Sequence, residues 1–234
     1  MQLFYNPNIS EGNTTFSFDK DESRHIVKVL RKKVGDQLHI TNGDGWLFEA
    51  ELTLVDTKHC TVKILTQKLQ AKRSFNLHLA VAPTKMNDRY EWFLEKATEI
   101  GIEEITPIIC DNSERKVIKL ERFEKILQSA MKQSLQCYLP KLNEPVSFKD
   151  FIDTSFSATR FIAHCENTDK KSLKSLLKPN NDTVILIGPE GDFSVKEIKM
   201  ALATDYIPVT LGSTRLRTET AAIVACHSVA LVNE

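Results

Sequence analysis

Two segments near the carboxyl end of this 234-residue chain combine glycines, acids and arginines in a pattern suited to ligand binding. Residues 188–192 read Gly-Pro-Glu-Gly-Asp, and residues 211–221 read Leu-Gly-Ser-Thr-Arg-Leu-Arg-Thr-Glu-Thr-Ala. Each segment follows an apolar run typical of a buried strand and precedes a run with helical periodicity. Open α/β sheets bind ligands at the carboxyl ends of their strands, so the two segments predict one pocket walled by backbone amides.

The first segment offers backbone groups to a ligand, but its chemistry does not suit phosphate. It lacks the lysine and Ser/Thr of a P-loop and the three glycines of a dinucleotide fingerprint. Glu190 and Asp192 would repel a triphosphate, and they fit better beside ribose hydroxyls or a cationic ligand. A tight strand-to-helix turn without any ligand is the simpler interpretation of Gly-x-x-Gly alone.

The second segment adds positive charge. Arg215 and Arg217 alternate with Leu216, which predicts both arginines on one side of the segment and the leucine on the other. Thr218 is the expected N-cap of the following helix, and Glu219 in its first turn suits the helix dipole. An ion pair or a subunit contact is the more common role for each arginine.

The sequence lacks the patterns of several other catalytic classes. No Gly-x-Ser-x-Gly elbow occurs, and the six histidines show no metal-ligand spacing, so neither a serine hydrolase nor a metal site is expected. His25, His164 and His227 are predicted to be packing or surface residues. Five scattered cysteines without a C-x-x-C pair indicate a reduced, cytoplasmic compartment.

The elements that must position the two segments belong to an alternating pattern that begins near residue 74. Strands at 77–82, 105–109, 160–164 and 183–187 alternate with helices at 88–100 and 120–136, which predicts a parallel sheet covered by helices. The capping box from Ser194 to Glu197 starts another helix directly after the first segment. The residues after Thr218 are apolar on nearly all sides of a helix, so that helix must be buried in the core or against another subunit.

Residues 1–70 have a different pattern, that of a small β-barrel. Strands at 36–41 and 46–52 flank the hairpin signal Asn-Gly-Asp-Gly, a third strand is expected at 59–65, and a helix at 21–33. Six basic residues fall within residues 24–33, although such a run is equally a solvated helix face. The 31 basic and 31 acidic residues balance, and no apolar stretch approaches the length of a membrane span.

Taken together, these motifs resemble those of the RsmE family, the small-subunit ribosomal RNA methyltransferases of the SPOUT class. The resemblance rests on residues 188–191 and 211–221, on 24–31 (Arg-His-x-x-x-Val-Leu-Arg), on 95–101 (Glu-Lys-Ala-Thr-Glu-Ile-Gly) and on 113–115 (Ser-Glu-Arg). It implies a PUA-like β-barrel domain over residues 1–70, followed by an α/β trefoil-knot methyltransferase domain over residues 74–234.

The resemblance also implies the activity, which is methylation of a uracil N3 in 16S ribosomal RNA within the 30S subunit by a homodimer that uses S-adenosylmethionine. For this activity we expect Arg217 to be catalytic, as the stabiliser of the negative charge that develops when N3 loses its proton, and Glu219 to be the weaker candidate for a base. The expected cofactor residues are Leu186, Ile187, Gly188, Pro189, Glu190, Gly191, Leu211, Gly212, Leu216, Arg217, Thr218, Thr220 and Ala221. The expected RNA-binding residues are Arg24, His25, Arg31, Lys33, Lys85 and Arg115, and no membrane or metal is expected.

Three residues depart from the family pattern. Asp192 stands where the family usually has a third glycine, and Gln136 and Tyr138 stand where it often has arginines. Two other functions stay open at this point. One is a related SPOUT enzyme that methylates a ribose 2′-hydroxyl or another base, and the other is a non-catalytic RNA-binding factor with the same fold.

Overall fold

The structure is a computed structural model that describes residues 2–234. The contacts within the chain divide it into two compact units. The first comprises residues 1–72 and 131–139, and the second comprises residues 73–130 and 140–234. Residues 131–139 therefore group with the amino-terminal unit, although they lie far along the sequence.

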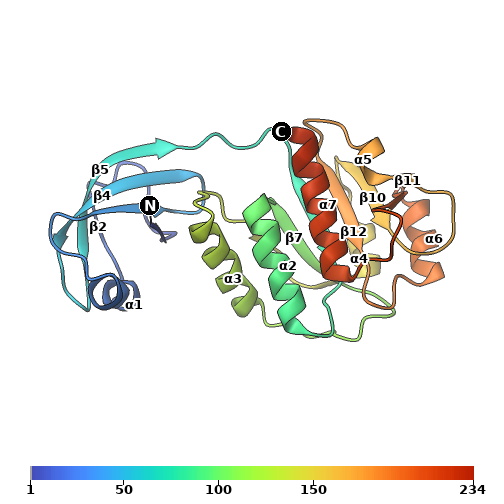
Figure 1. Cartoon of the computed structure of the whole chain (residues 1–234), viewed down its shortest axis with the longest axis horizontal. Helices are drawn as coiled ribbons and strands as arrows, with labels where there is room; N and C mark the ends of the chain where they lie inside the picture. The colour runs from blue at the N-terminus through green and yellow to red at the C-terminus, as the bar shows by residue number, and fades with distance from the viewer. Residues whose placement is uncertain (1) are drawn as a thin grey trace. The chain divides into compact units, whose positions relative to one another are not determined.

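The first unit is built on a curled five-stranded sheet (Figure 1). Its strands are β1 (Leu3–Tyr5), β2 (Thr15–Ser17), β3 (Gln37–Thr41), β4 (Trp46–Leu54) and β5 (Thr61–Leu69). The order across the sheet is β1-β3-β4-β5-β2, and all pairings are antiparallel except that of β1 with β3. The inner face packs a core that includes Phe4, Ile26, Ile40 and Phe48.

Residues 137–139 pack against the hairpin between β3 and β4. Thr41 Oγ1 donates to the Cys137 carbonyl at 3.1 Å, and the Leu139 amide donates to the Gly43 carbonyl at 2.8 Å. The Tyr138 hydroxyl donates to the Gln70 carbonyl at 2.8 Å, and its ring lies where a side chain on Gly45 would stand. Tyr138 thus has a structural role.

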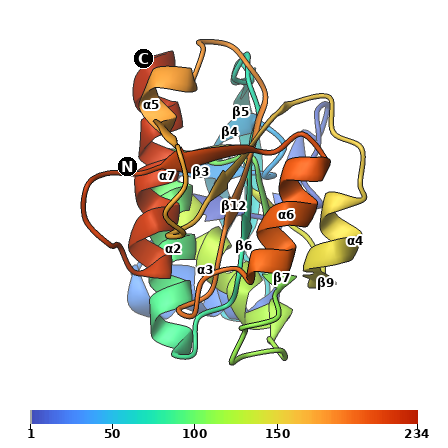
Figure 2. The same cartoon turned by 90° about the vertical axis from the view of Figure 1, so that its right-hand side faces the viewer.

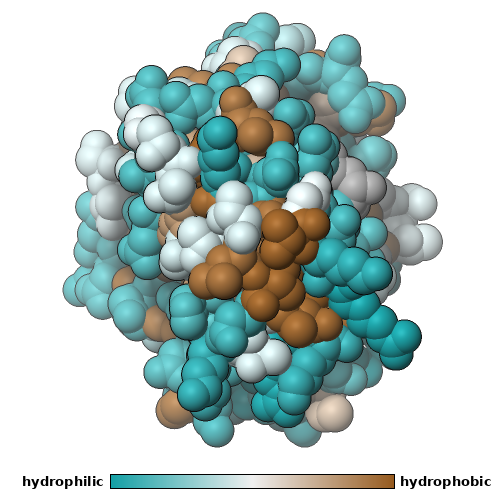
Figure 3. Space-filling view, turned by 90° about the vertical axis from the view of Figure 1, so that its left-hand side faces the viewer, coloured by the Kyte–Doolittle hydropathy of each residue, from teal (hydrophilic) through white to brown (hydrophobic). Residues whose placement is uncertain are grey.

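The basic segment of the first unit is less regular than its sequence predicts. Instead of one helix over 21–33, α1 (Lys20–Arg24) continues as a single π-helical turn, η1 (His25–Val29). Arg31 then adopts a left-handed φ of 54°, which ends the helix. Val29 and Val34 are exposed beside these basic residues. Figure 3 shows a patch of hydrophobic residues surrounded mostly by hydrophilic ones.

The second unit contains an eight-stranded sheet in which every pairing between described strands is parallel. Its strands are β6 (Leu77–Val81), β7 (Glu104–Ile109), β8 (Lys141–Leu142), β9 (Val146–Ser147), β10 (Thr159–Ala163), β11 (Lys171–Ser172), β12 (Thr183–Ile187) and β13 (Ile207–Thr210). The order is β11-β13-β10-β12-β6-β7-β8, with β9 paired to β7. The predicted parallel sheet is confirmed, and β12 lies at its centre.

Helices cover both faces of this sheet. The helices after residue 73 are α2 (Asn87–Ile100), α3 (Leu120–Gln133), whose last three residues group with the first unit, α4 (Phe148–Ile152), α5 (Leu173–Leu176), α6 (Val195–Ala203) and α7 (Thr218–Asn233). Figure 2 shows α2 and α7 on one face of the sheet and α4 and α6 on the other, in agreement with the contacts between these elements. The capping box of Ser194 and Glu197 starts α6 as predicted.

The most apolar helix, α7, is buried on one side. Ala222, Ala225, Cys226 and Val229 are buried against α2 and the sheet, whereas Leu231 is 48% exposed. The helix was predicted to be buried in the core or against another subunit, and this side of α7 is buried in the core. No helix among residues 2–234 is long and apolar enough to cross a membrane.

Candidate active site

The carboxyl ends of three neighbouring parallel strands enclose two adjoining cavities. Strand β12 leads into residues 188–192, β13 leads into residues 211–217, and β10 leads into residues 164–170. Because all three strands run in the same direction, their carboxyl ends meet at one edge of the sheet. The two predicted segments are therefore brought together.

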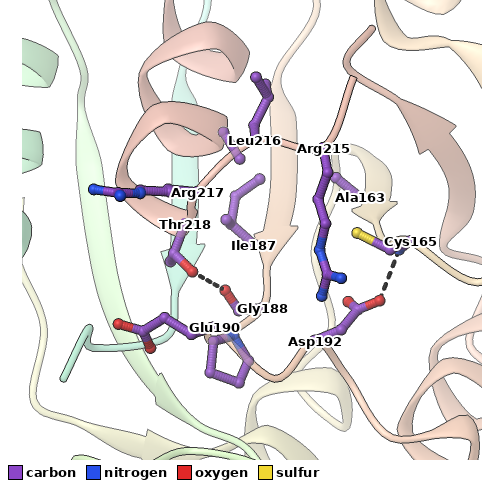
Figure 4. Close-up of a pocket in the computed structure, with 12 residues that line it drawn as sticks. Ala163, Cys165, Ile187, Gly188, Glu190, Asp192, Arg215, Leu216, Arg217 and Thr218 are labelled. Carbon is purple, nitrogen blue, oxygen red and sulfur yellow. Dashed lines mark hydrogen bonds between the residues drawn. The ribbon is translucent and has the colours of Figure 1, made fainter. Parts of the chain in front are cut away.

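The two cavities share part of their walls. The first measures about 290 Å³ and is lined by Ala163, Cys165, Ile187, Gly188, Pro189, Glu190, Asp192, Arg215, Leu216, Arg217, Thr218 and Ala221 (Figure 4). The second measures about 390 Å³ and is lined by Ala163, His164, Cys165, Lys170, Val209, Thr210, Leu211, Gly212, Ser213, Thr214, Arg215, Leu216 and Ala221. The two cavities form one continuous site, because both are lined by Ala163, Cys165, Arg215, Leu216 and Ala221.

Neighbouring loops hold residues 188–192 in place. The Lys85 amide donates to Glu190 Oε1 at 2.9 Å, and Asn112 Nδ2 donates to the Gly191 and Asp192 carbonyls at 3.1 Å each. On the other side, Thr218 Oγ1 donates to the Gly188 carbonyl at 3.0 Å. The loop is fixed from several directions, which favours a preformed ligand site.

Asp192 adopts a backbone conformation that side chains other than glycine rarely take. Asp192 has a φ of 61°, in the left-handed region that glycine enters most easily and that aspartate tolerates. Its carboxylate uses this conformation, because it accepts from the Cys165 amide at 2.7 Å and from the Phe193 amide at 2.8 Å. Asp192 thus ties the β12 loop to the β10 loop.

The segment before α7 departs from two predictions. Residues 215–217 are not a strand, so alternation does not apply, and Figure 4 shows Arg215 extending toward Asp192 while Arg217 points the other way. The N-cap of α7 is Arg217, without a side-chain cap, and Thr218 is the first helical residue. The Thr218 hydroxyl is free to donate to Gly188 because it does not cap the helix.

Most of the predicted cofactor residues line the cavities. These are Ile187, Gly188, Pro189, Glu190, Leu211, Gly212, Leu216, Arg217, Thr218 and Ala221. Leu186, Gly191 and Thr220 line neither one. Leu186 is fully buried in the sheet core, since its side chain points to the opposite face from that of Ile187.

Of the two residues predicted to be catalytic, only Arg217 lines a cavity. Its exposed guanidinium makes no ion pair or hydrogen bond with any residue of the described chain. Glu219 is buried at 6% exposure, with Oε1 3.9 Å from Arg89 Nε and Oε2 without a hydrogen-bond partner among described residues. The Glu219 carboxylate therefore faces α2 rather than the cavities.

The β10 loop is the part of the site that the two motifs did not indicate. Ala163, His164, Cys165 and Lys170 line the cavities, and His164 was predicted to be only a packing or surface residue. The available signal was the predicted strand at 160–164, because its carboxyl end must share an edge with the other parallel strands. Its neighbour in the sheet could not be assigned from the sequence.

Two of the predicted RNA-binding residues lie on loops of the same sheet edge. Lys85 Nζ is 2.8 Å from Glu114 Oε2, and the Glu114 carboxylate raises the pKa of Lys85. The Arg115 guanidinium donates to the Thr84 and Lys85 carbonyls, at 2.7 Å in the shortest contact. The other four belong to the first unit, where Arg24, Arg31 and Lys33 are exposed and His25 packs its ring edge against Phe4.

The described residues contain no cluster of three or more His, Cys, Asp or Glu side chains arranged to hold a metal ion. The site instead combines glycine-rich backbone, apolar side chains, carboxylates and unpaired arginines.

Comparison with known families identifies this arrangement. A family model described as an RNA methyltransferase domain matches residues 71–230, and one described as an RNA methyltransferase PUA domain matches residues 18–65. The chain belongs to this family of RNA methyltransferases. The resemblance seen in the sequence motifs is confirmed.

Relatives of this RNA methyltransferase cover nearly the whole chain. The ribosomal RNA small subunit methyltransferase E of Buchnera aphidicola is 33% identical, over 90% of this chain and 85% of the relative. Among solved structures, a probable rRNA-methyltransferase from Porphyromonas gingivalis is 40% identical, covers 100% of this chain and 98% of that one, and has a TM-score of 0.93. A ribosomal RNA small subunit methyltransferase E from Neisseria gonorrhoeae, solved bound to S-adenosyl methionine, is 27% identical, covers 100% and 98%, and has a TM-score of 0.88.

Proposed function

We propose that this protein transfers a methyl group from S-adenosylmethionine to the N3 of a uracil in 16S ribosomal RNA, uracil-1498, in the 30S subunit. The observation that carries the proposal is the junction of residues 188–192 and 211–221 in one site with an unpaired arginine at its wall. The names of the relatives support the substrate, and the geometry supports a bound cofactor.

The residues of the site fit S-adenosylmethionine. Leu211, Leu216 and Ala221 supply apolar walls for a purine, and the backbone of residues 188–190 offers polar groups in the adjoining cavity. Glu190 Oε2 is buried without a hydrogen-bond partner in the described chain, which leaves a carboxylate oxygen available to a ligand. Carboxylates beside the cavity are compatible with a positively charged sulfonium.

When bound, the cofactor supplies an electrophilic methyl group, so the acceptor must be electron-rich and aligned with it. Loss of the N3 proton from uracil places negative charge on the neighbouring carbonyl oxygens. Arg217 stabilises that charge, because its guanidinium lines the cavity and is not neutralised by any acid of the described chain. Glu219 is the weaker candidate for the base, since its carboxylate contacts Arg89.

RNA binding is assigned to the first unit and to the rim of the site. Exposed Arg24, Arg31 and Lys33 provide positive charge for phosphates. Arg115 positions the loop of Lys85 through backbone carbonyls, and both remain candidates for RNA contact. Because the net charge is zero, shape recognition of a structured ribosomal particle is favoured over bulk attraction.

The homodimer is proposed from exposed apolar side chains on two adjacent helices. Trp92 on α2 is 46% exposed, Leu231 on α7 is 48% exposed, and the two helices pack against each other. The trefoil knot, the assignment of residues 1–70 and 74–234 to two functional domains, and the cytoplasmic location stay predictions.

The proposal is tested by transfer of labelled methyl from S-adenosylmethionine to 30S subunits from a strain that lacks this gene. The RNA is digested to nucleosides, which are identified by mass. We expect N3-methyluridine. A ribose-methylated product would instead support the related SPOUT enzyme, and cofactor binding without transfer would contradict the proposed substrate.

Arg217→Ala tests the assigned role. We expect a loss of turnover on the order of 100- to 1000-fold, the range for loss of one charge-stabilising donor, while S-adenosylhomocysteine binding changes little. Arg24→Ala, in the first unit, is the matched control and should weaken RNA binding without lowering the maximal rate as much. Turnover by Arg217→Ala equal to the unmodified enzyme would rule the role out.

A further inference from the structure

His164 is a buried polar side chain that faces the site without a partner. It follows β10 directly, is 7% exposed, and lines the second cavity. Neither ring nitrogen has a hydrogen-bond partner among residues 2–234. Buried polar groups are nearly always hydrogen-bonded, so an unpaired imidazole at a cavity wall indicates a ligand group that completes it.

The surroundings of His164 favour the neutral ring. Burial, followed by the charge of Lys170, lowers the pKa of His164, while Asp192 and Glu166 act in the opposite direction. Lys170 Nζ donates to the carbonyls of His164 and Glu166, at 2.6 and 2.7 Å, so its charge stays beside the ring. A neutral imidazole presents one donor and one acceptor.

The rest of the second cavity has both aliphatic and polar lining, and the polar part comes from Lys170, Thr210, Ser213, Thr214 and Arg215. Val209, Leu211, Leu216 and Ala221 contribute aliphatic surface, and the backbone of Gly212 approaches without a side chain. Adenine matches this combination, because its faces are apolar and its edge carries an amino donor beside ring-nitrogen acceptors.

We propose that His164 hydrogen-bonds the adenine edge of the cofactor and selects that base. This inference rests on the proposed use of S-adenosylmethionine. It adds a recognition residue on β10, outside the two motif segments. His164 is a binding residue in this proposal and has no part in methyl transfer.

The test is calorimetric binding of S-adenosylhomocysteine and its inosine counterpart, which replaces the amino donor with a carbonyl. The unmodified protein should bind the adenosine form at least 10-fold more tightly. His164→Leu should bind the adenosine form about 10-fold more weakly, the loss of a buried hydrogen bond, and should lose most of the preference between bases. His164→Gln, which keeps a donor and an acceptor, should retain part of that preference.

The controls separate this inference from the proposed function. If the unmodified protein binds neither compound, the proposed cofactor is wrong. If it binds them equally, or if His164→Leu weakens both by the same factor, His164 does not read the base and the inference is overturned. His59→Leu, an exposed histidine of the first unit, should leave both affinities unchanged.

Discussion

Acid should destabilise the second unit through His78, which is buried within the sheet. His78 is 7% exposed, its Nε2 lies 2.7 Å from Thr106 Oγ1, and its ring packs edge-on against Phe151 and Phe156. Burial lowers the pKa of His78 from 6.5 to about 4, against the opposing attraction of Glu104. The folded state thus resists protonation of this ring.

The sign and the size of the effect follow from linkage. His78 takes up a proton near pH 6.5 in the unfolded chain and only near pH 4 in the folded chain. The free energy of unfolding is therefore highest above pH 6.5 and decreases as the pH falls from 6.5 to 4. At pH 5 the free energy of unfolding is lower than at pH 7.5 by about 2 kcal/mol, and below pH 4 this decrease approaches roughly 3 kcal/mol.

The assay is urea unfolding at pH 7.5 and pH 5.0, followed by Trp92 fluorescence in a Trp46→Phe background so that only the second unit reports. The comparison is His78→Phe, which removes the titrating ring, while Thr106 keeps its bond from Asn143 at 2.7 Å. Between pH 7.5 and pH 5.0, the free energy of unfolding of the protein with His78 should fall by about 2 kcal/mol more than that of the His78→Phe variant. Equal losses would refute the reasoning.

Three further changes test other parts of the structure. Gly45→Ala should destabilise the first unit by about 2–3 kcal/mol, because the new methyl group combines a positive φ with a clash against Tyr138. Gly35→Ala, whose methyl group meets open space, should destabilise it by only about 1 kcal/mol. Equal losses of unfolding free energy in chemical denaturation would argue against the Tyr138 contact. Thr218→Val should lower the free energy of unfolding by about 1 kcal/mol, and it should weaken S-adenosylhomocysteine binding because Gly188 is held less firmly. Thr218→Ser, which keeps the hydroxyl, should restore both stability and binding. Normal binding by the valine variant would contradict the role of this hydrogen bond. Cys165 is exposed and lines the first cavity, while the other four cysteines are buried. A thiol reagent should therefore modify one cysteine quickly, and bound S-adenosylhomocysteine should slow that modification. If S-adenosylhomocysteine still slows a fast modification in Cys165→Ser, another cysteine is the protected one.

Sequence periodicity was sufficient for the regular elements of the second unit. The strand at 183–187 is observed with the same bounds, and the capping box at Ser194 starts α6 as predicted. Both depend on local signals, namely an apolar run between polar residues and a side chain that caps its own helix. The two motif segments meet because the parallel sheet fixes where its strands end.

Features that depend on distant partners could not be predicted in the same way. The hydrogen bond from Thr218 to Gly188 is a tertiary contact. The local pattern at Thr218 favours an N-cap, and the competing carbonyl of Gly188 is 30 residues away in the chain. The cavity residues on the β10 loop were missed because the order of strands in a sheet is not encoded in any one segment.

The grouping of residues 131–139 with the amino-terminal unit has a consequence for how the protein is made. The chain passes between the units at residues 72–73, 130–131 and 139–140, so neither unit is a single continuous stretch. During synthesis, the hairpin around Gly43 and Gly45 lacks Cys137, Tyr138 and Leu139 until more than half of the protein has left the ribosome. The amino-terminal unit is therefore completed by a late segment, and the residues of the two units are interleaved along the chain.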